Sequence, residues 1–179
     1  MLNDIEIVYY SEEVLVDIVK KLGAQISEDY KDKNLLLVSV LKGSVIFMAD
    51  LMRAITVPCA IDFMCVSSYA NKTESSGAVK IIKDLDINLE GWDVLIVEDI
   101  LDSGRTLSYL KKILMSRRPK SMKICTLLDK PERREVPMEP EYKCFVIEDE
   151  FVVGYGLDYA EEYRNLPYVG VLKRSVYEK

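Results

Sequence analysis

Short apolar runs of strand length alternate along this chain with stretches whose apolar residues recur at helical spacing, and this alternation constrains the fold most. The run Leu35–Leu41 is almost continuously apolar, which is typical of a strand buried on both faces. Similar runs occupy Asp93–Val97 and Met122–Leu128. The pattern predicts an α/β fold in which a mainly parallel, twisted sheet with a five-strand core is flanked by helices. Ligands of such sheets bind at the carboxyl ends of the strands.

The remaining elements are expected to continue the same alternation. Ser11 is followed by two acids and is the expected N-cap of the first helix, and Gly23 is its expected end. Two further helices are expected over Val45–Ile55 and Arg105–Arg118. The other expected segments are strands at Cys59–Ser67, Lys80–Ile87 and Tyr142–Ile147 and near Val169, with polar loops at Ser68–Ala78 and Pro131–Pro140.

Length and charge limit the classes of protein to which the chain can belong. A chain of 179 residues favours a single domain with a substantial core. Its 24 Lys and Arg against 30 Asp and Glu give a net charge of -6 without a basic run, which argues against a nucleic-acid or membrane partner. The chain contains no histidine, so His-based catalytic triads and His-ligated zinc are excluded.

The cysteines and the first residues indicate the cellular compartment. Cys59, Cys65, Cys125 and Cys144 form no C-x-x-C pair and lie in apolar runs, which is typical of the buried, reduced thiols of a cytoplasmic protein. The N-terminal residues are acidic and lack an apolar segment, so no signal peptide is expected. No apolar run approaches the length of a membrane span.

The sharpest motif of the chain runs from Val94 to Leu107. An apolar strand leads into two adjacent acids, Glu98 and Asp99, and then into a short loop that opens a helix. Backbone N–H groups at a helix start favour a phosphate, and Gly104 lets the chain approach such a group closely. Paired carboxylates beside it suit sugar hydroxyls or a Mg²⁺ ion that accompanies a polyphosphate. A capped helix start with solvated acids is the alternative interpretation.

This motif resembles the phosphoribosyl diphosphate (PRPP) motif of the type I phosphoribosyltransferases: four apolar residues, two acids, two apolar residues and then D-[ST]-G-x-T. No G-x-x-x-x-G-K-[ST] loop of the P-loop proteins occurs. The aspartate at position 102 is similar to that of the 6-oxopurine branch. Further matches in chain order are Leu41–Gly43, Ser68–Tyr69, Leu128–Pro131, Phe151–Tyr159 and Arg164. Over residues 35–172 the chain therefore resembles the bacterial hypoxanthine (hypoxanthine-guanine) phosphoribosyltransferase family.

The resemblance implies a single phosphoribosyltransferase domain over residues 1–179, with a small hood formed from about 1–10 and 150–179. It implies a pentosyltransferase of purine salvage that requires Mg²⁺ and acts in the cytoplasm. The enzyme would transfer 5-phosphoribosyl from PRPP to N9 of hypoxanthine or guanine, giving IMP or GMP and pyrophosphate. We further expect a homodimer or homotetramer, with no nucleic-acid or membrane partner.

The resemblance also implies a role for each matched residue. Asp102 would be the general base that takes the proton from N7 of the purine while N9 attacks C1 of the ribose. Its alternative role is a helix N-cap. Glu98 and Asp99 would hold ribose hydroxyls and Mg²⁺, and Asp158 would bind a second Mg²⁺; all three could instead be solvated acids. The residues implied to bind the phosphates of PRPP are Lys42, Gly43, Ser103, Gly104, Arg105, Thr106 and Arg164.

For the purine base, the resemblance assigns Lys130 as a hydrogen-bond donor to the 6-oxygen, which favours oxopurines over adenine. Taken alone, Lys130 lies in a charged run and is typical of a solvated loop lysine. Phe151 would stack on the ring and Val152 would accept from it through the backbone carbonyl, although these residues are also typical of a core strand. Asp158 would also lie beside the base. The residues implied to form a closing lid are Ser68 and Tyr69.

Three alternatives remain open at this point. The first is the same reaction with a preference for xanthine or guanine. The second is an RNA-binding regulator that reuses the phosphoribosyltransferase fold, which the net charge of -6 argues against. The third is a non-catalytic nucleotide sensor, against which the presence of Glu98, Asp99 and Asp102 argues.

Overall fold

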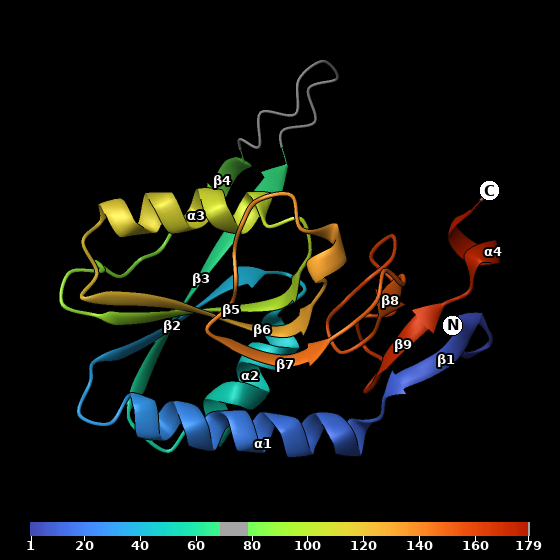
Figure 1. Ribbon diagram of the computed structural model, residues 1–179, viewed down its shortest axis with the longest axis horizontal. Helices are drawn as coiled ribbons and strands as arrows, with labels where there is room; N and C mark the ends of the chain where they lie inside the picture. Colours follow the sequence, from blue (N-terminus) through green and yellow to red (C-terminus); the bar gives the residue numbers. More distant parts are fainter. Residues whose placement is uncertain (69–78, 179) are drawn as a thin grey trace.

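The computed structural model describes residues 1–68 and 79–178, which form a larger and a smaller β-sheet (Figure 1). The larger sheet has six strands in the order β4-β3-β2-β5-β6-β7. The five strands from β3 to β7 in this order run parallel, and β4 joins the edge of the sheet antiparallel to β3. This confirms the predicted parallel core. The bounds are β2 Leu35–Leu41, β3 Cys59–Ser68, β4 Val79–Lys83, β5 Asp93–Leu101, β6 Ser121–Asp129 and β7 Tyr142–Val146.

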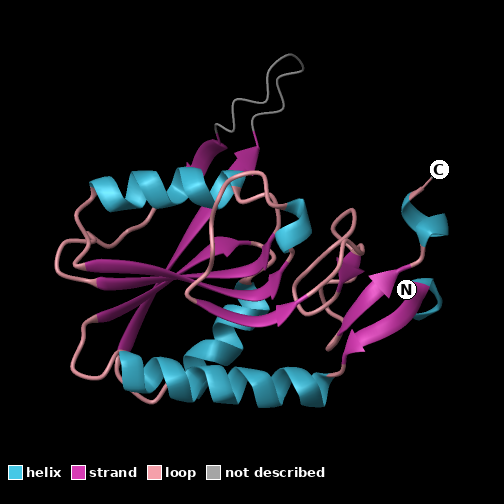
Figure 2. Cartoon of the chain, viewed as in Figure 1, coloured by secondary structure: helices cyan, strands magenta, loops and turns pink. Residues whose placement is uncertain are grey.

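Helices cover both faces of this sheet (Figure 2). The helices α1 (Glu12–Asp29) and α2 (Val45–Ala54) lie on one face, and α3 (Arg105–Ser116) lies on the other. The side chains of β5 divide between the two cores, because alternate residues of a strand point to opposite faces. Leu95 and Val97 pack in the core under α1 and α2, whereas Val94 and Ile96 pack under α3.

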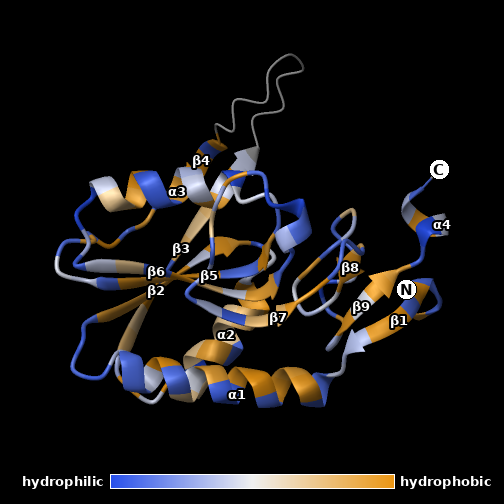
Figure 3. Ribbon diagram, in the orientation of Figure 1, coloured by the Kyte–Doolittle hydropathy of each residue, from blue (hydrophilic) through white to orange (hydrophobic). Residues whose placement is uncertain are grey.

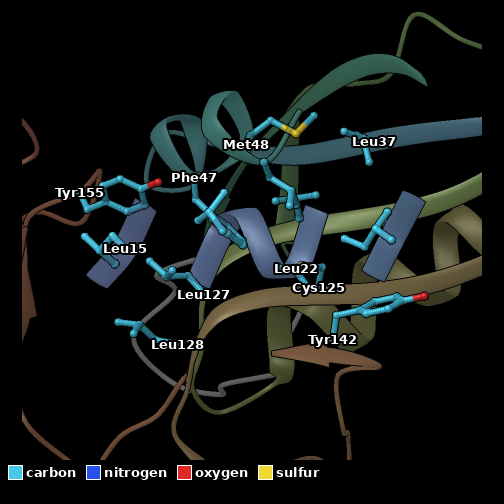
Figure 4. Packing of buried hydrophobic residues seen from close by; sticks show 14 of the residues in the cluster. Leu15, Leu22, Leu37, Phe47, Met48, Cys125, Leu127, Leu128, Tyr142 and Tyr155 are labelled. Carbon is cyan, nitrogen blue, oxygen red and sulfur yellow. The ribbon is translucent and has the colours of Figure 1, made fainter. Parts of the chain in front are cut away.

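The core under α1 and α2 is closely packed (Figure 4). Leu15 and Leu22 of α1, Phe47 of α2 and Leu127 of β6 are all buried in this core. Figure 3 shows apolar residues along the strands of the larger sheet and mixed polar and apolar residues along α1. Helices with such mixed faces bury one stripe against the sheet and keep the other in water. In the described part of the chain, no helix has both the length and the apolar character that a membrane span requires.

The first helix begins as predicted but ends later than predicted. Ser11 is the N-cap, and its side chain accepts a hydrogen bond from the Val14 N–H at 3.4 Å. The expected end at Gly23 is wrong, because the helix continues to Asp29. A Cβ atom at Gly23 would lie 2.6 Å from Cβ of Ala54 on α2. The glycine therefore allows α1 and α2 to approach each other closely.

The smaller sheet joins the two ends of the chain. Its strands are β1 (Ile5–Tyr10), β9 (Val169–Leu172) and β8 (Val152–Val153), paired antiparallel in the order β1-β9-β8. It lies beyond the end of the larger sheet toward which the parallel strands point (Figure 1). Three short helices complete the described structure: η1 Leu2–Asp4, η2 Pro131–Arg133 and α4 Arg174–Tyr177.

Two details of the core bear on the sequence predictions. All four cysteines are free, and the prediction that they are buried holds for Cys125, whereas Cys59, Cys65 and Cys144 are partly buried. Strand β5 extends beyond the predicted Val97 to Leu101. Glu98 and Asp99 therefore lie within the strand, where neighbouring side chains alternate between its two faces.

Candidate active site

The predicted site residues follow the carboxyl ends of three parallel strands. Lys42 and Gly43 follow β2, and the Leu41–Lys42 peptide bond is cis. Asp102 follows β5 in the loop that leads to α3, and Lys130 follows β6. The ends of parallel strands meet at one edge of the sheet, so residues distant in sequence are brought together there.

The two acids of β5 point to opposite faces of the sheet. Glu98 continues the face of Val94 and Ile96, whereas Asp99 continues that of Leu95 and Val97. Asp99 lies directly against Gly43, where any Cβ atom would collide with Asp99 Oδ2. Gly43 therefore leaves the space that the carboxylate occupies.

Burial dominates the electrostatics of both acids of β5. Burial raises the pKa of Asp99 to about 6, and the negative charge of Asp158 adds to this effect while Arg164 opposes it. Burial, followed by the charge of Asp99, raises the pKa of Glu98 well above its usual range. Carboxylates held away from water in this way gain from a bound cation or from hydroxyl donors.

The loop after β5 leaves the N-terminus of α3 without a side-chain cap. Gly104 occupies the N-cap position with φ 79°, in the left-handed region that favours glycine. Asp102 lies two residues before this position, so the alternative interpretation of Asp102 as an N-cap is wrong. Ser103 Oγ accepts a hydrogen bond from the Arg105 N–H at 3.4 Å. Among residues 1–68 and 79–178, no side-chain acceptor is found for the other N–H groups of the first turn, which could bind an anion.

Asp102 is bound to the segment after β6 by two arginines for which the sequence predicted no role. Arg133 Nε donates to Asp102 Oδ1 at 3.2 Å, and Arg133 Nη1 donates to Asp149 Oδ2 at 3.3 Å. Arg134 donates to the backbone carbonyl of Asp102 and pairs with the fully buried Asp129. The charged run after β6 therefore holds the loop after β5, and its only sequence signal was the closely spaced opposite charges.

Lys130 is almost buried, so the interpretation of it as a solvated loop lysine is wrong. Its side chain is 10% exposed, and Nζ donates to the Glu150 carbonyl at 2.6 Å and lies 3.7 Å from Asp149 Oδ1. Lys130 and Asp102 line one cavity of about 430 Å³, together with Phe151. An ammonium group can donate three hydrogen bonds, which leaves donors free for a ligand in this cavity.

Aromatic side chains from the C-terminal part of the chain form another wall of this cavity. The ring of Phe151 stacks on Tyr177 of α4, with centroids 4.9 Å apart and an interplanar angle of 25°. Tyr159 meets Phe151 edge to face at 5.6 Å. Val152 is buried and pairs with Val171 of β9. The sequence carried no signal that placed Tyr177 at this site.

Lys42 and Arg164 come together on a second side of the site. Lys42 Nζ lies 3.0 Å from Glu161 Oε2, and Arg164 Nη2 lies 3.3 Å from the same oxygen. Arg164 also contacts Asp158 Oδ1 at 2.9 Å. A Cβ atom at Gly156 would collide with the carbonyl of Gly43, so the two loops are in direct contact.

The remaining predicted site residues lie at the start of α3 and at the end of β3. Arg105, at the start of α3, forms an ion pair with Glu135 on the surface. Thr106 is exposed on the first turn of the same helix. Ser68 is the last residue of β3, and Tyr69 lies outside the described residues. Within residues 1–68 and 79–178, no three His, Cys, Asp or Glu side chains gather as a metal-binding set.

Comparison with known families agrees with this arrangement. The model of the phosphoribosyl transferase domain matches residues 9–160. The chain belongs to the phosphoribosyltransferase family. Among its relatives, the hypoxanthine-guanine phosphoribosyltransferase of Streptococcus pyogenes is 57% identical over 177 residues, which cover 99% of this chain and 98% of the relative. That of Streptococcus agalactiae is 56% identical over 177 residues, with the same coverage of 99% and 98%.

Solved structures share the fold as well as the sequence. A hypoxanthine phosphoribosyltransferase from Staphylococcus aureus has a TM-score of 0.97 and 53% identity, covering 100% of this chain and 97% of the other. A second structure is a hypoxanthine-guanine phosphoribosyltransferase from Bacillus anthracis with a HEPES molecule in its active site. It has a TM-score of 0.91 and 50% identity, and the match covers 94% of this chain and 99% of the other. The predicted fold class, a type I phosphoribosyltransferase fold, is confirmed.

Proposed function

We propose that the protein is a hypoxanthine-guanine phosphoribosyltransferase of purine salvage. It transfers 5-phosphoribosyl from PRPP to N9 of hypoxanthine or guanine, giving IMP or GMP and pyrophosphate. The observation that carries this proposal is the cavity that Asp102, Lys130 and Phe151 share. It combines a carboxylate, a buried cationic donor and an aromatic face, which are the groups that a 6-oxopurine requires. Relatives named for this activity, 57% identical over 99% of the chain, support it.

In the proposed mechanism the base lies in this cavity against Phe151. Lys130 Nζ donates a hydrogen bond to the 6-oxygen, and Val152 accepts one through its backbone carbonyl. The amino group of adenine would face the Lys130 ammonium with no acceptor, and such buried mismatches exclude analogues by about 10⁴- to 10⁵-fold. Asp102 accepts the proton from N7 as N9 attacks C1 of the ribose, because a carboxylate can do this work in a chain without histidine.

The phosphate groups of PRPP would bind on either side of the ribose. The 5-phosphate takes the uncapped N-terminus of α3, where backbone N–H groups and the hydroxyls of Ser103 and Thr106 can donate. The pyrophosphate takes the side on which Lys42 and Arg164 converge, with the Gly43 backbone beside them. Glu98 binds a ribose hydroxyl from the opposite face of β5.

The carboxylates fit a Mg²⁺ ion that accompanies PRPP. Asp99 and Asp158 would supply hard oxygen ligands, and the pKa of Asp99, raised to about 6 chiefly by burial, marks a carboxylate whose charged form a bound cation would stabilise. Mg²⁺ in phosphate-transfer sites takes one or two carboxylates and completes its shell with phosphate oxygens and water, so a full protein ligand set is not needed. When bound, the ion neutralises the charge of the pyrophosphate group and so stabilises it as the leaving group.

The experiment that tests the function offers single bases to the purified protein. The protein is incubated with PRPP and Mg²⁺ and with hypoxanthine, guanine, xanthine, adenine or uracil, and the nucleotide formed is measured. We expect product from hypoxanthine and guanine and none from adenine or uracil. Xanthine as the best substrate would assign a xanthine-preferring enzyme instead. No product from any base would overturn the enzymatic proposal.

We also propose that the enzyme acts as a homodimer or homotetramer. The C-terminal region of a Trypanosoma cruzi relative, 43% identical with a TM-score of 0.93, is described as having a role in oligomeric state and activity. Light scattering on the purified protein measures the assembly directly, and a monomer at assay concentration would contradict the proposal.

A further inference from the structure

One carboxylate oxygen of Glu161 bridges the two cations proposed to bind pyrophosphate. Glu161 Oε2 accepts from Lys42 Nζ at 3.0 Å and from Arg164 Nη2 at 3.3 Å. Both cations therefore share one anionic oxygen, as they would share an oxygen of a bound pyrophosphate. The mechanism proposed above gives Glu161 no part in the reaction.

The backbone around Glu161 fixes this position. Ala160 and Glu161 both have positive φ, 52° and 67°, in the left-handed region that non-glycine residues seldom adopt. The Glu161 N–H donates to Asp158 Oδ2 at 2.9 Å, and Tyr159 pairs with Glu162 across the turn. The turn therefore presents the Glu161 side chain toward the loop after β2.

The side chain of Glu161 can nevertheless leave without disturbing its surroundings. It is 65% exposed, and Lys42 is 63% exposed. Exposed ion pairs of this kind are weak because water screens them, so an incoming polyanion displaces them easily. Arg164 keeps Asp158 at 2.9 Å and the Gly156 carbonyl at 2.8 Å when Glu161 moves away.

We propose that Glu161 is an internal anion that occupies the pyrophosphate subsite and is displaced when the pyrophosphate group of PRPP, or free pyrophosphate, binds. This inference rests on the proposed function, because that function places pyrophosphate on Lys42 and Arg164. Glu161 competes with both ligands for the same cations. It weakens the binding of pyrophosphate and favours its release after the transfer.

The charges around the pyrophosphate subsite determine whether loss of Glu161 strengthens or weakens pyrophosphate binding. Three carboxylates, those of Glu161, Asp158 and Asp99, act on the region of Arg164 and Lys42. Removing the charge of Glu161 leaves two carboxylates against two cations, which favours an incoming polyanion. If Glu161 instead served to orient Lys42 and Arg164 for the ligand, its removal would weaken binding.

The test compares Glu161→Gln with a matched control, Glu162→Gln, in the full-length protein. Glu162 is the next residue, is exposed, and forms no ion pair among the described residues. The dissociation constant of pyrophosphate is measured by calorimetry in magnesium buffer, and the KM for PRPP and for hypoxanthine by steady-state kinetics. We expect Glu161→Gln to lower the dissociation constant of pyrophosphate and the KM for PRPP, each about three- to tenfold. The KM for hypoxanthine and all constants of Glu162→Gln should stay within twofold of the parent protein.

Pyrophosphate binding that is unchanged or weaker in Glu161→Gln overturns the inference. An equal gain in pyrophosphate affinity in Glu162→Gln assigns the effect to net charge and also overturns it. Glu161→Ala is a second variant in case the glutamine amide forms new contacts, and we expect the same gain in pyrophosphate affinity from it. Lys42→Ala separates failure of the inference from failure of the proposed function. If Lys42→Ala weakens pyrophosphate binding while Glu161→Gln does not strengthen it, only the inference fails. If Lys42→Ala leaves binding unchanged, the proposed subsite itself is wrong.

Discussion

Arg133 donates from Nε to Asp102 Oδ1 over 3.2 Å. The pair links the loop after β5 to the segment after β6, which also carries Lys130. The proposed general base and the proposed 6-oxygen donor are therefore coupled through one short stretch of chain. A change in either loop shifts both groups, so variants that alter the charge of one group without moving the backbone are the most informative.

Asp102→Asn replaces the proposed base by an isosteric amide that cannot accept the N7 proton. We expect turnover with hypoxanthine to fall by about 10²- to 10⁴-fold, which is the usual contribution of a general base. Binding of IMP should change little, because the backbone of the loop is retained. Steady-state kinetics and calorimetric titration with IMP measure the two effects. Turnover close to that of the parent protein would show that Asp102 does not deprotonate the base.

Lys130→Ala removes the buried donor beside Glu150. We expect the KM for hypoxanthine to rise by about 10-fold or more, because a hydrogen bond from a charged donor contributes about 1.5–3 kcal/mol. The KM for PRPP should stay within about twofold of the parent value if Lys130 binds only the base. Lys111→Ala on α3, which removes a lysine 3.9 Å from Glu141, is the control for loss of one positive charge. Equal losses for both substrates would assign Lys130 a general electrostatic or structural role.

The sequence predicts this fold well where local and tertiary signals agree. Leu35–Leu41 forms β2 within its predicted bounds, because a strand buried on both faces is apolar throughout. Ser11 is the N-cap of α1 because capping depends on the nearest few residues. The predicted end of α1 at Gly23 is wrong because this glycine makes room for Ala54 of α2. That contact joins distant parts of the chain and has no local sequence signal.

The sequence supplied candidate site residues, but it did not supply the contacts that the structure shows around them. The motif after β5 identified Asp102 from sequence, but nothing local showed that Arg133 would pair with it. Lys130 lies in a charged run that is typical of solvent, yet the end of β6 and the segment before β8 enclose its side chain. Such contacts depend on loops that meet only after the sheet has formed.

Asp99→Asn tests the electrostatics of β5 through the pH dependence of stability. The pKa of Asp99 is raised to about 6 in the folded protein, above a value of about 3.9 in an unfolded chain. The folded state therefore binds more protons between these values, and the contribution of Asp99 to stability falls as pH rises from about 4 through 6. Without added metal, we expect Asp99→Asn to raise the free energy of unfolding at pH 7.5 by about 1–2 kcal/mol.

The gain should shrink toward pH 3, below both pKa values, where Asp99 is largely protonated in both the folded and the unfolded state. Urea denaturation at the two pH values measures it. A gain of equal size at both would show that Asp99 does not carry the shifted pKa. The same variant should lose most of its transfer activity, since it removes a proposed magnesium ligand.

Gly156→Ala tests the contact that brings the loop of Asp158 against Lys42 and Gly43. Gly156 has φ +103°, and a Cβ atom there would collide with the Gly43 carbonyl. Both the strained backbone and the collision oppose the substitution, so we expect a loss of about 2–3 kcal/mol in the free energy of unfolding. The KM for PRPP should rise as well, because both loops of the proposed pyrophosphate subsite must move apart.

Gly91→Ala is the matched control for this substitution. Gly91 also has a positive φ, +85°, but a Cβ atom there meets nothing within 4 Å. The Gly91→Ala variant should therefore lose only about 1 kcal/mol in the free energy of unfolding, from backbone strain, and keep the parent KM for PRPP. Urea denaturation and steady-state kinetics on both variants separate the two contributions. Equal losses at Gly156 and Gly91, with the KM for PRPP unchanged in both, would show that the contact with Gly43 does not hold the subsite together.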